Sequence, residues 1–246
     1  MSPTGSDGGQ RRLNLAGRRF VITGGGTGIG LAVAQQAVHQ GASVVLLGRT
    51  ASILQEASAA LSTTASYRVV DVTDGPALTR AFEHIGPFDH LVTCAAGISI
   101  GGFSELPEEA YRSFFEVKFW GQYRALRAAI PYLSREGSVT LLSGYLYRKP
   151  APGFSVFAAV NGAIEALVKV LAIELAPLRI NALAPGQVDT LERILGPDGN
   201  RARKESAAAS LPLKRIGTAA EIAHAAVFLA ENTFMTGATL DVDGGE

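Results

Sequence analysis

The sequence is poor in the features that mark secreted, nucleic-acid-binding and membrane proteins. Cys94 is the sole cysteine among 246 residues, so no internal disulfide can form, and a reducing cytoplasm is the expected location. Lysine plus arginine equals aspartate plus glutamate at 22 each, which leaves no excess charge to attract a nucleic acid or an anionic membrane. Glycine, proline or charge interrupts every apolar stretch, so we expect no membrane span.

Two regions follow from composition. Residues 1–14 are polar and glycine-rich and lack the apolar run of a signal peptide, so we expect a flexible leader. Residues 15–246 form one expected domain, because 47% hydrophobic and 18% charged residues suit a large buried core. The four histidines share no metal-ligand spacing, so no metal is expected.

Short apolar runs alternate with helical patterns from end to end. The expected strands are 19–23, 43–47, 67–70, 89–94, 138–142, 178–183 and 239–242, and the expected helices are 29–40, 51–61, 76–85, 107–133, 154–176 and 221–230. Strands joined by helical crossovers run parallel and have both faces covered. The pattern therefore predicts an α/β fold with a doubly wound parallel sheet. Residues 191–211 fit neither period, and we expect a mobile lid there.

A glycine-rich segment, Thr23–Gly30, connects the first expected strand to the first helix. Gly24 can leave the strand with a positive φ, Gly28 can admit a diphosphate to the helix N-terminus, and Gly30 can let helix and sheet pack closely. Any tight turn favours glycine, but the strand–turn–helix context favours a dinucleotide site. We expect Thr27 and Ile29 to contact the dinucleotide as well.

The end of the second expected strand discriminates between the two nicotinamide coenzymes. An NAD site usually places an acidic residue there to bind the ribose 2′-hydroxyl. This strand ends in Gly48-Arg49, and a guanidinium suits a phosphate instead. The sequence therefore predicts NADP(H), with the alternative that Arg49 only caps a loop.

With these motifs the chain resembles the short-chain dehydrogenase/reductase family over Leu15 to Glu246. The further matching segments are Asp71-Val72, Ala95-Ala96-Gly97, Asn181–Gly186 followed by Val188 and Thr190, and Thr236–Gly245. The resemblance implies a Rossmann fold, a small-molecule substrate and a homodimer or homotetramer. It also implies that Asp71 and Val72 contact adenine, that Ala95, Ala96 and Gly97 border the coenzyme, and that Pro185, Gly186, Val188 and Thr190 lie beside the nicotinamide.

The catalytic residues depart from the family pattern of Asn, Ser, Tyr and Lys. In that pattern the tyrosine donates a proton to the substrate oxygen, and a nearby ammonium lowers the tyrosine pKa. Here Ser143 matches the serine, but Phe157 occupies the tyrosine position, Asn161 the lysine position and Lys118 the asparagine position. Phenylalanine has no proton to give, so the usual mechanism cannot be carried over.

Substitutes for the missing donor remain open. Lys118 could contact the ribose or act as the acid, or it could be an ordinary helix lysine in solvent. Tyr145 or Tyr147 could point into the site from the loop. Tyr145 and Lys149 form a Tyr-x-x-x-Lys string, but Pro150 and Pro152 follow it, so we do not expect them on one helix face. The candidate catalytic residues are Ser143, Lys118, Asn161 and Tyr145.

Two functions are therefore carried forward. The first is an NADP(H)-dependent oxidoreductase that transfers hydride to or from a small carbonyl, alcohol or imine, where an imine depends least on a tyrosine acid. The second is a dinucleotide-binding protein without redox turnover, such as a structural subunit or a sensor. Basic residues in the lid, Arg193, Arg201, Arg203 and Lys204, fit either an acidic ligand or a solvated face. For Cys94 we expect packing, and for Phe119 and Trp120 core or interface burial.

Overall fold

The computed structural model describes residues 14–190 and 192–246, so the expected leader lies outside it except for Asn14. Within these residues one parallel sheet has the order β3-β2-β1-β4-β5-β6-β7. The strands are β1 (Arg19–Thr23), β2 (Ser43–Gly48), β3 (Ala65–Val69), β4 (Phe88–Thr93), β5 (Leu133–Leu142), β6 (Arg179–Pro185) and β7 (Thr239–Val242). The order reverses between β1 and β4, which is where such sheets bind ligands at their carboxyl ends.

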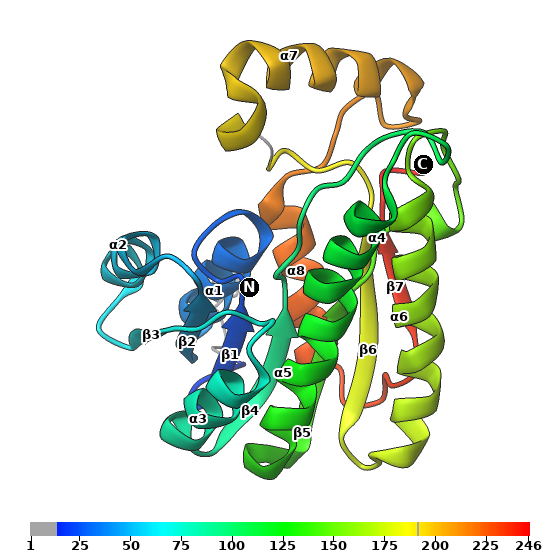
Figure 1. The fold of residues 1–246 in the computed structure, drawn as a ribbon. Helices are drawn as coiled ribbons and strands as arrows, with labels where there is room; N and C mark the ends of the chain where they lie inside the picture. The colour runs from blue at the N-terminus through cyan, green and yellow to red at the C-terminus, as the bar shows by residue number, and fades with distance from the viewer. Residues whose placement is uncertain (1–13, 191) are drawn as a thin grey trace, which may run out of the picture.

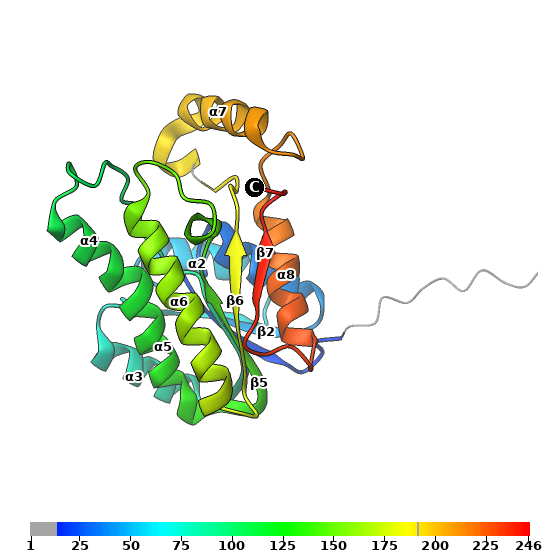
Figure 2. The same ribbon diagram turned by 90° about the vertical axis from the view of Figure 1, so that its right-hand side faces the viewer.

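Helices cover both faces of the sheet, as Figures 1 and 2 show. One face carries α1 (Gly28–His39), α2 (Ala51–Leu61) and α8 (Ala219–Glu231), and the other carries α3 (Gly75–Ile85), α4 (Glu108–Phe115), α5 (Gly121–Ala129) and α6 (Ser155–Glu174). Alternation along β1 joins the two cores, because Phe20 and Ile22 pack in the first and Val21 in the second. The doubly wound α/β prediction is confirmed.

The long helix expected over 107–133 is not uniform. A π-helical turn, η1 (Glu116–Trp120), separates α4 from α5, and a short 3-10 turn, η2 (Ile130–Tyr132), ends the run. The following strand β5 begins at Leu133, earlier than expected, because Pro131 stops the helix. Single π turns inside α-helices frequently occur at functional sites.

Residues 192–210 form α7, two helical stretches joined across a kink, in the segment where the sequence fits neither period. Gly196 is non-helical, with φ 71° and ψ 170°, and Pro197 follows it, so the pair breaks the periodicity of the sequence. Figure 1 shows α7 above the carboxyl ends of the strands. Whether α7 moves stays a prediction.

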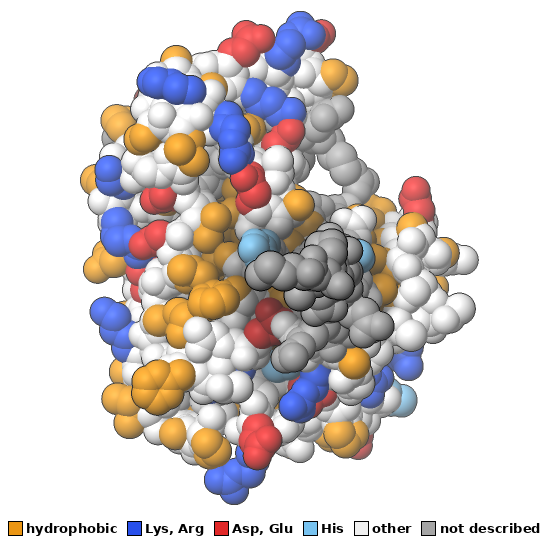
Figure 3. Space-filling view, turned by 180° about the vertical axis from the view of Figure 1, so that it is seen from behind, with side chains coloured by type: hydrophobic (Ala, Val, Ile, Leu, Met, Phe, Trp, Pro, Cys, Tyr) orange, Lys and Arg blue, Asp and Glu red, His pale blue; other side chains and the backbone are white. Residues whose placement is uncertain are grey.

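Contacts with the segment after β6 hold α7 in place. The Nδ2 atom of Asn200 donates to Oδ1 of Asp189 at 2.9 Å, and Lys204 forms an ion pair with Asp189. Arg201 pairs with Asp198 at 2.8 Å. Both described basic side chains of the lid are therefore matched by carboxylates, which agrees with the interspersed basic and acidic side chains in Figure 3.

By length and composition, α6 is the one helix of the described residues that could cross a membrane. In this fold it packs beside β5 and β6, and Val156, Val160, Ile164 and Val168 lie buried in the second core. One third of its apolar window is buried in the fold, and a single helix of this length and composition is weak evidence for a membrane span.

Candidate coenzyme and catalytic site

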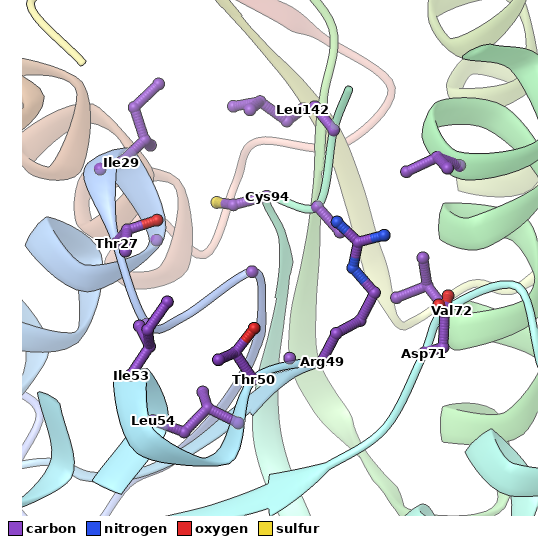
Figure 4. A pocket seen from close by; sticks show the side chains of 18 of the residues that line it. Thr27, Ile29, Arg49, Thr50, Ile53, Leu54, Asp71, Val72, Cys94 and Leu142 are labelled. Atoms are coloured by element: carbon purple, nitrogen blue, oxygen red, sulfur yellow. The ribbon is translucent and has the colours of Figure 1, made fainter. Parts of the chain in front are cut away.

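A cavity of about 590 Å³ opens at the carboxyl ends of β1, β2 and β4. Figure 4 shows it between the glycine turn with Thr27 and Ile29 on one side and Asp71 with Val72 on the other. It is lined by Gly24, Gly26, Thr27, Gly28, Ile29, Gly30, Gly48, Arg49, Thr50, Ile53, Leu54, Val70, Asp71, Val72, Cys94, Ala95, Ala96, Val117, Leu142 and Thr190. The predicted glycine turn therefore lies in a cavity of ligand size.

Close backbone approach explains two of the glycines. Gly24 has φ +66°, and a Cβ there would lie 2.8 Å from the backbone nitrogen of Ala95. A Cβ on Gly30 would lie 2.3 Å from the carbonyl oxygen of Gly24. Side chains at these positions would push the turn away from the end of β4, so the shape of the cavity depends on glycine.

The helix N-termini that face this cavity are open. Thr27 precedes α1 and Thr50 precedes α2, and neither side chain makes a capping hydrogen bond to a described residue. Elsewhere in the fold, Asp74 caps α3 and Thr218 caps α8 with its own side chain. The first amides of α1 and α2 are therefore left to bind an anion in the cavity.

Arg49 and Asp71 line the same cavity but differ in their contacts with the rest of the protein. The Arg49 side chain extends from the end of β2 into the cavity in Figure 4, and no ion pair among the described residues includes it. The Oδ1 atom of Asp71 accepts hydrogen bonds from the backbone nitrogen and hydroxyl of Thr73, both at 2.9 Å. The guanidinium is thus available to a ligand, while one carboxylate oxygen of Asp71 shapes its own turn.

The structure gathers most of the predicted coenzyme residues and leaves some outside the cavity lining. Lining it are Gly24, Thr27, Gly28, Ile29, Gly30, Arg49, Asp71, Val72, Ala95, Ala96 and Thr190, whereas Gly97, Lys118, Pro185, Gly186 and Val188 are not in the lining. Sequence reasoning missed Thr50, Ile53 and Leu54. Their signal was position: they lie in the first turn after Arg49, where a helix start faces the ligand edge.

The segment after β6 is fixed by its own backbone contacts. The Gly186 nitrogen donates to the Val242 carbonyl at 3.0 Å, and a Cβ on Gly186 would lie 2.6 Å from the Cα atom of Asp243. Val188 pairs with Gly217 in an isolated bridge. This path brings Thr190 to the mouth of the cavity, 3.6 Å from a Cβ built on Gly28. The nicotinamide contacts of Pro185, Gly186 and Val188 stay a prediction.

Lys118 lies inside the protein. Its side chain comes from the π turn η1, and the residue is 6% exposed. Its Nζ atom donates to Oδ1 of Asn161 at 2.7 Å and to the Ser143 carbonyl at 3.0 Å. The same atom lies 6.0 Å from the Phe114 ring centre and 5.8 Å from the Phe157 ring centre. The alternative of an ordinary lysine in solvent is therefore wrong.

Burial lowers the pKa of Lys118 to about 8. The low-dielectric surroundings disfavour the ammonium, and the two hydrogen-bond acceptors are neutral. A lysine with such a pKa can give and take a proton near neutral pH, which an exposed lysine does poorly.

Asn161 is held where it can bind this ammonium. It is 1% exposed on α6, and a Cβ on Gly144 would lie 2.8 Å from its Nδ2 atom. Gly144 therefore permits the close approach of the amide. The exchange of lysine and asparagine suggested by the sequence brings Lys118 and Asn161 into direct contact.

The carbonyl and the hydroxyl group of Ser143 bind different partners. Its carbonyl binds Lys118, while its hydroxyl donates to Oε1 of Glu165 at 2.8 Å and to the Asn161 carbonyl at 3.3 Å. Glu165 is buried and also forms an ion pair with Arg148, which in turn pairs with Asp241 of β7. The hydroxyl of Ser143 is thus directed at α6, and its expected catalytic role stays a prediction.

The loop tyrosines lie in a short turn that ends before Lys149. A 3-10 turn, η3 (Tyr145–Tyr147), follows β5, and the Lys149 nitrogen donates to the Tyr145 carbonyl at 3.0 Å without a longer helix forming. Tyr147 is exposed and packs over Gly162, where a Cβ would lie 2.9 Å from its ring. Tyr145 is half-buried, and its role as a substitute donor stays a prediction.

Phe157 occupies the tyrosine position with an aromatic contact. Its ring lies 4.4 Å from that of Phe114 and 5.8 Å from that of Phe154, measured between centres. The rings form an apolar wall beside Lys118. Phe157 therefore contributes ring packing where the family pattern has a tyrosine hydroxyl group.

Gln122 is a site residue that sequence reasoning missed. Its Nε2 atom donates to the carbonyls of Lys118 and Leu142 at 2.6 and 3.1 Å, and its Oε1 atom accepts from the Leu142 nitrogen at 2.9 Å. Gln122 therefore ties the π turn to the end of β5. The sequence carried no signal for it, because a glutamine in a helix usually reaches solvent.

The surroundings of Cys94 and Trp120, two further residues considered from the sequence, can also be described. Burial raises the pKa of Cys94 to about 12, so its thiol stays protonated at the edge of the cavity and is a poor nucleophile. Among residues 14–190 and 192–246, no group of three histidine, cysteine or acidic side chains is arranged to hold a metal ion. Trp120 is 42% exposed in the single chain, so it is not core.

Comparisons with known proteins find similar proteins over most of the chain. The family model described as enoyl-(acyl carrier protein) reductase matches residues 24–246. The chain is 30% identical to short-chain dehydrogenase/reductase ATR9 of Stachybotrys chlorohalonatus, covering 94% of this chain and 97% of that protein. It is 34% identical to galactitol 2-dehydrogenase (L-tagatose-forming) of Cereibacter sphaeroides, covering 95% and 96%. A crystal structure of a small-chain dehydrogenase in complex with NADPH is 34% identical, with a TM-score of 0.81 over 93% of this chain and 97% of that one.

Proposed function

Because the chain belongs to the short-chain dehydrogenase/reductase family of oxidoreductases, we propose that it is an NADP(H)-dependent oxidoreductase with an atypical proton donor. Its substrate is a small carbonyl, alcohol or imine. A solved relative binds NADPH, and the cavity of this chain carries the groups that such a coenzyme needs.

The coenzyme diphosphate fits the open start of α1. Thr27 leaves the first amides of α1 uncapped by described side chains, and Gly24, Gly28 and Gly30 keep the approach clear. Asp71 and Val72 border the adenine end, and Thr190 borders the nicotinamide end. When bound, the coenzyme supplies or accepts the hydride.

The observation that carries the preference for NADP(H) is the Arg49 guanidinium, which extends into the cavity without a described carboxylate partner. Thr50 adds a hydroxyl, and the uncapped start of α2 adds backbone amides beside it. A guanidinium, a hydroxyl and helix amides together suit a 2′-phosphate.

The test is coenzyme affinity of Arg49→Ala, measured by calorimetry. We expect the NADPH Kd to rise about 10- to 100-fold, since a charged hydrogen bond contributes about 1.5–3 kcal/mol, and the NADH Kd to change little. Arg68→Ala, an exposed arginine next to β2, is the matched control and retains wild-type affinity. Unchanged NADPH affinity in Arg49→Ala contradicts the assignment.

Lys118 is the proposed proton donor. In reduction, its Nζ atom gives a proton to the substrate oxygen or nitrogen as hydride adds to carbon, and in oxidation it takes that proton back. Asn161 and the Ser143 carbonyl hold the amine in place, and Gln122 holds the turn that carries it. Tyr145 is the second candidate donor, from the turn after β5.

A dinucleotide-binding protein without redox turnover is the alternative. It is favoured by the packing of Phe157 on Phe114 and by the bond from the Ser143 hydroxyl to Glu165. A panel of ketones, aldehydes and imines with NADPH, followed by absorbance, separates the two functions. Turnover lost in Lys118→Met supports the oxidoreductase, and tight NADPH binding without turnover supports the alternative.

The assembly and the lid complete the proposal. We propose a cytoplasmic homodimer or homotetramer, supported by apolar side chains left exposed on the helical layer, namely Trp120 at 42%, Val170 at 50% and Ile173 at 80%. Light scattering of the purified chain tests this.

We further propose that α7 opens and closes over the site about Gly196. Protection of the chain from proteolysis by NADPH tests this motion.

A further inference from the structure

The ammonium of Lys118 is a buried cation whose described hydrogen-bond partners are both neutral. These partners are the Asn161 amide oxygen and the Ser143 carbonyl. No ion pair among the described residues includes Lys118. Buried charges in proteins are generally paired with an opposite charge, and an ammonium has three donors. An anion is therefore the partner that this enclosure lacks.

The nearby carboxylates are already matched. Glu165, which faces the site from α6, is paired with Arg148 from the turn after β5. Glu116, on the same π turn as Lys118, is paired with Arg124 of α5 at 2.6 Å. The phenol of Tyr145 is the other titratable group beside Ser143. The protein thus directs its own negative charges elsewhere.

The walls around Lys118 are flat and apolar. Phe114 and Phe157 place their rings about the amine, and Phe154 extends the wall from the loop before α6. The loop after β4 carries two exposed apolar side chains, Ile98 at 46% and Ile100 at 55%. A hydrogen bond from the Gly101 nitrogen to the Gly153 carbonyl, at 3.0 Å, joins this loop to the one that carries Phe154.

We propose that the substrate is a flat, apolar carbonyl compound that carries an anionic oxygen, and that this oxygen pairs with Lys118. The inference rests on the proposed function, because it takes the surroundings of Lys118, which lie outside the lining of the described cavity, as the substrate site. A carboxylate, a phenolate or an enolate has the required chemistry. A preformed iminium is disfavoured, since two cations would share one apolar enclosure.

Calorimetry with matched probes tests the proposal on the full chain. Benzoate is compared with benzamide, and para-nitrophenolate with nitrobenzene, both with and without NADP⁺. We expect the anion of at least one pair to bind about tenfold more tightly than its neutral partner, because a charge-assisted hydrogen bond is stronger than a neutral one. That preference disappears in Lys118→Met and persists in Lys149→Met, an exposed lysine of the nearby loop.

The pH dependence adds a second readout. Between about pH 7 and about pH 10 the ammonium loses its proton, so benzoate affinity falls while benzamide affinity stays constant. Equal affinities within both pairs, or no binding of any probe, overturn the proposal. Coenzyme titration reports on the proposed function separately, because the probe preference is expected without NADP⁺ as well.

Discussion

In the half of the site built by the glycine turn, β2 and α2, polar groups face the cavity without a described partner in the protein. In the half built by η1, β5 and α6, the polar groups bind one another. Thr27 and Thr50 cap nothing among the described residues, and Arg49 has no carboxylate partner there. Lys118, Ser143 and Glu165 are by contrast joined in one buried network. The first half is preorganised to bind a large polar ligand. The second half holds one protein group, the Lys118 amine, in a fixed position.

The largest expected effect is on activity, and it distinguishes the catalytic half from the coenzyme half. Lys118→Met removes the proposed acid and keeps the apolar stem, so kcat falls by about 100- to 10,000-fold. NADPH affinity changes far less. Steady-state rates and a coenzyme titration give both numbers, and Lys149→Met provides the control. Retained turnover in Lys118→Met moves the donor to Tyr145.

The next effect concerns the coenzyme half. Gly30→Ala places a Cβ 2.3 Å from the Gly24 carbonyl oxygen, so the turn must shift. We expect a loss of about 1–3 kcal/mol in the free energy of unfolding, as overpacking costs elsewhere, together with weaker NADPH binding. Gly75→Ala, whose Cβ would lie 3.7 Å from the Arg124 side chain, is the control. Urea unfolding measures both variants, and equal stability would show that the turn relaxes freely.

The third effect is a pH profile that belongs to the catalytic half. Reduction requires protonated Lys118, so kcat/KM is constant below the pKa of about 8 and falls about tenfold per pH unit above it. Oxidation has the opposite slope. In Lys118→Met the residual rate loses this break. A wild-type profile without it would show that another group donates the proton.

The smallest effect concerns the support of that half. Glu165→Gln keeps the shape of the side chain but weakens its bonds with Ser143 and Arg148. We expect a decrease of about 1–3 kcal/mol in stability and a several-fold lower kcat, because the Ser143 carbonyl that holds Lys118 becomes less fixed. Glu83→Gln, an exposed glutamate of α3, is the matched control. Wild-type values for Glu165→Gln would make the network incidental to catalysis.

The two halves also differed in how far the sequence predicted them. The coenzyme half follows from local rules, because glycine positions, a strand end and a helix start fix where Gly24, Gly30 and Arg49 lie. The fold and its parallel sheet followed from alternating periods for the same reason. Such signals are contained within a few neighbouring residues.

The catalytic half depends on contacts between distant segments. The sequence placed Ser143 at the end of β5 but not the direction of its hydroxyl, which Glu165 from α6 determines. Burial of Lys118 depends on the packing of α4 and α6 around it, and no local pattern encodes that. The helix α7 was missed because Gly196 and Pro197 interrupt its period.

The π turn Glu116–Trp120 makes the position of the amine sensitive to chain length. Such a turn holds one residue more than an α-helical turn, and each α-helical residue advances the direction of the side chains by about 100°. Deleting Phe119 would remove the extra residue and restore regular winding, so α4 and α5 would keep their faces while the side chains of the turn itself shift. A single-residue deletion in this helix is therefore expected to displace the Lys118 amine from Asn161 while the flanking helices keep their packing.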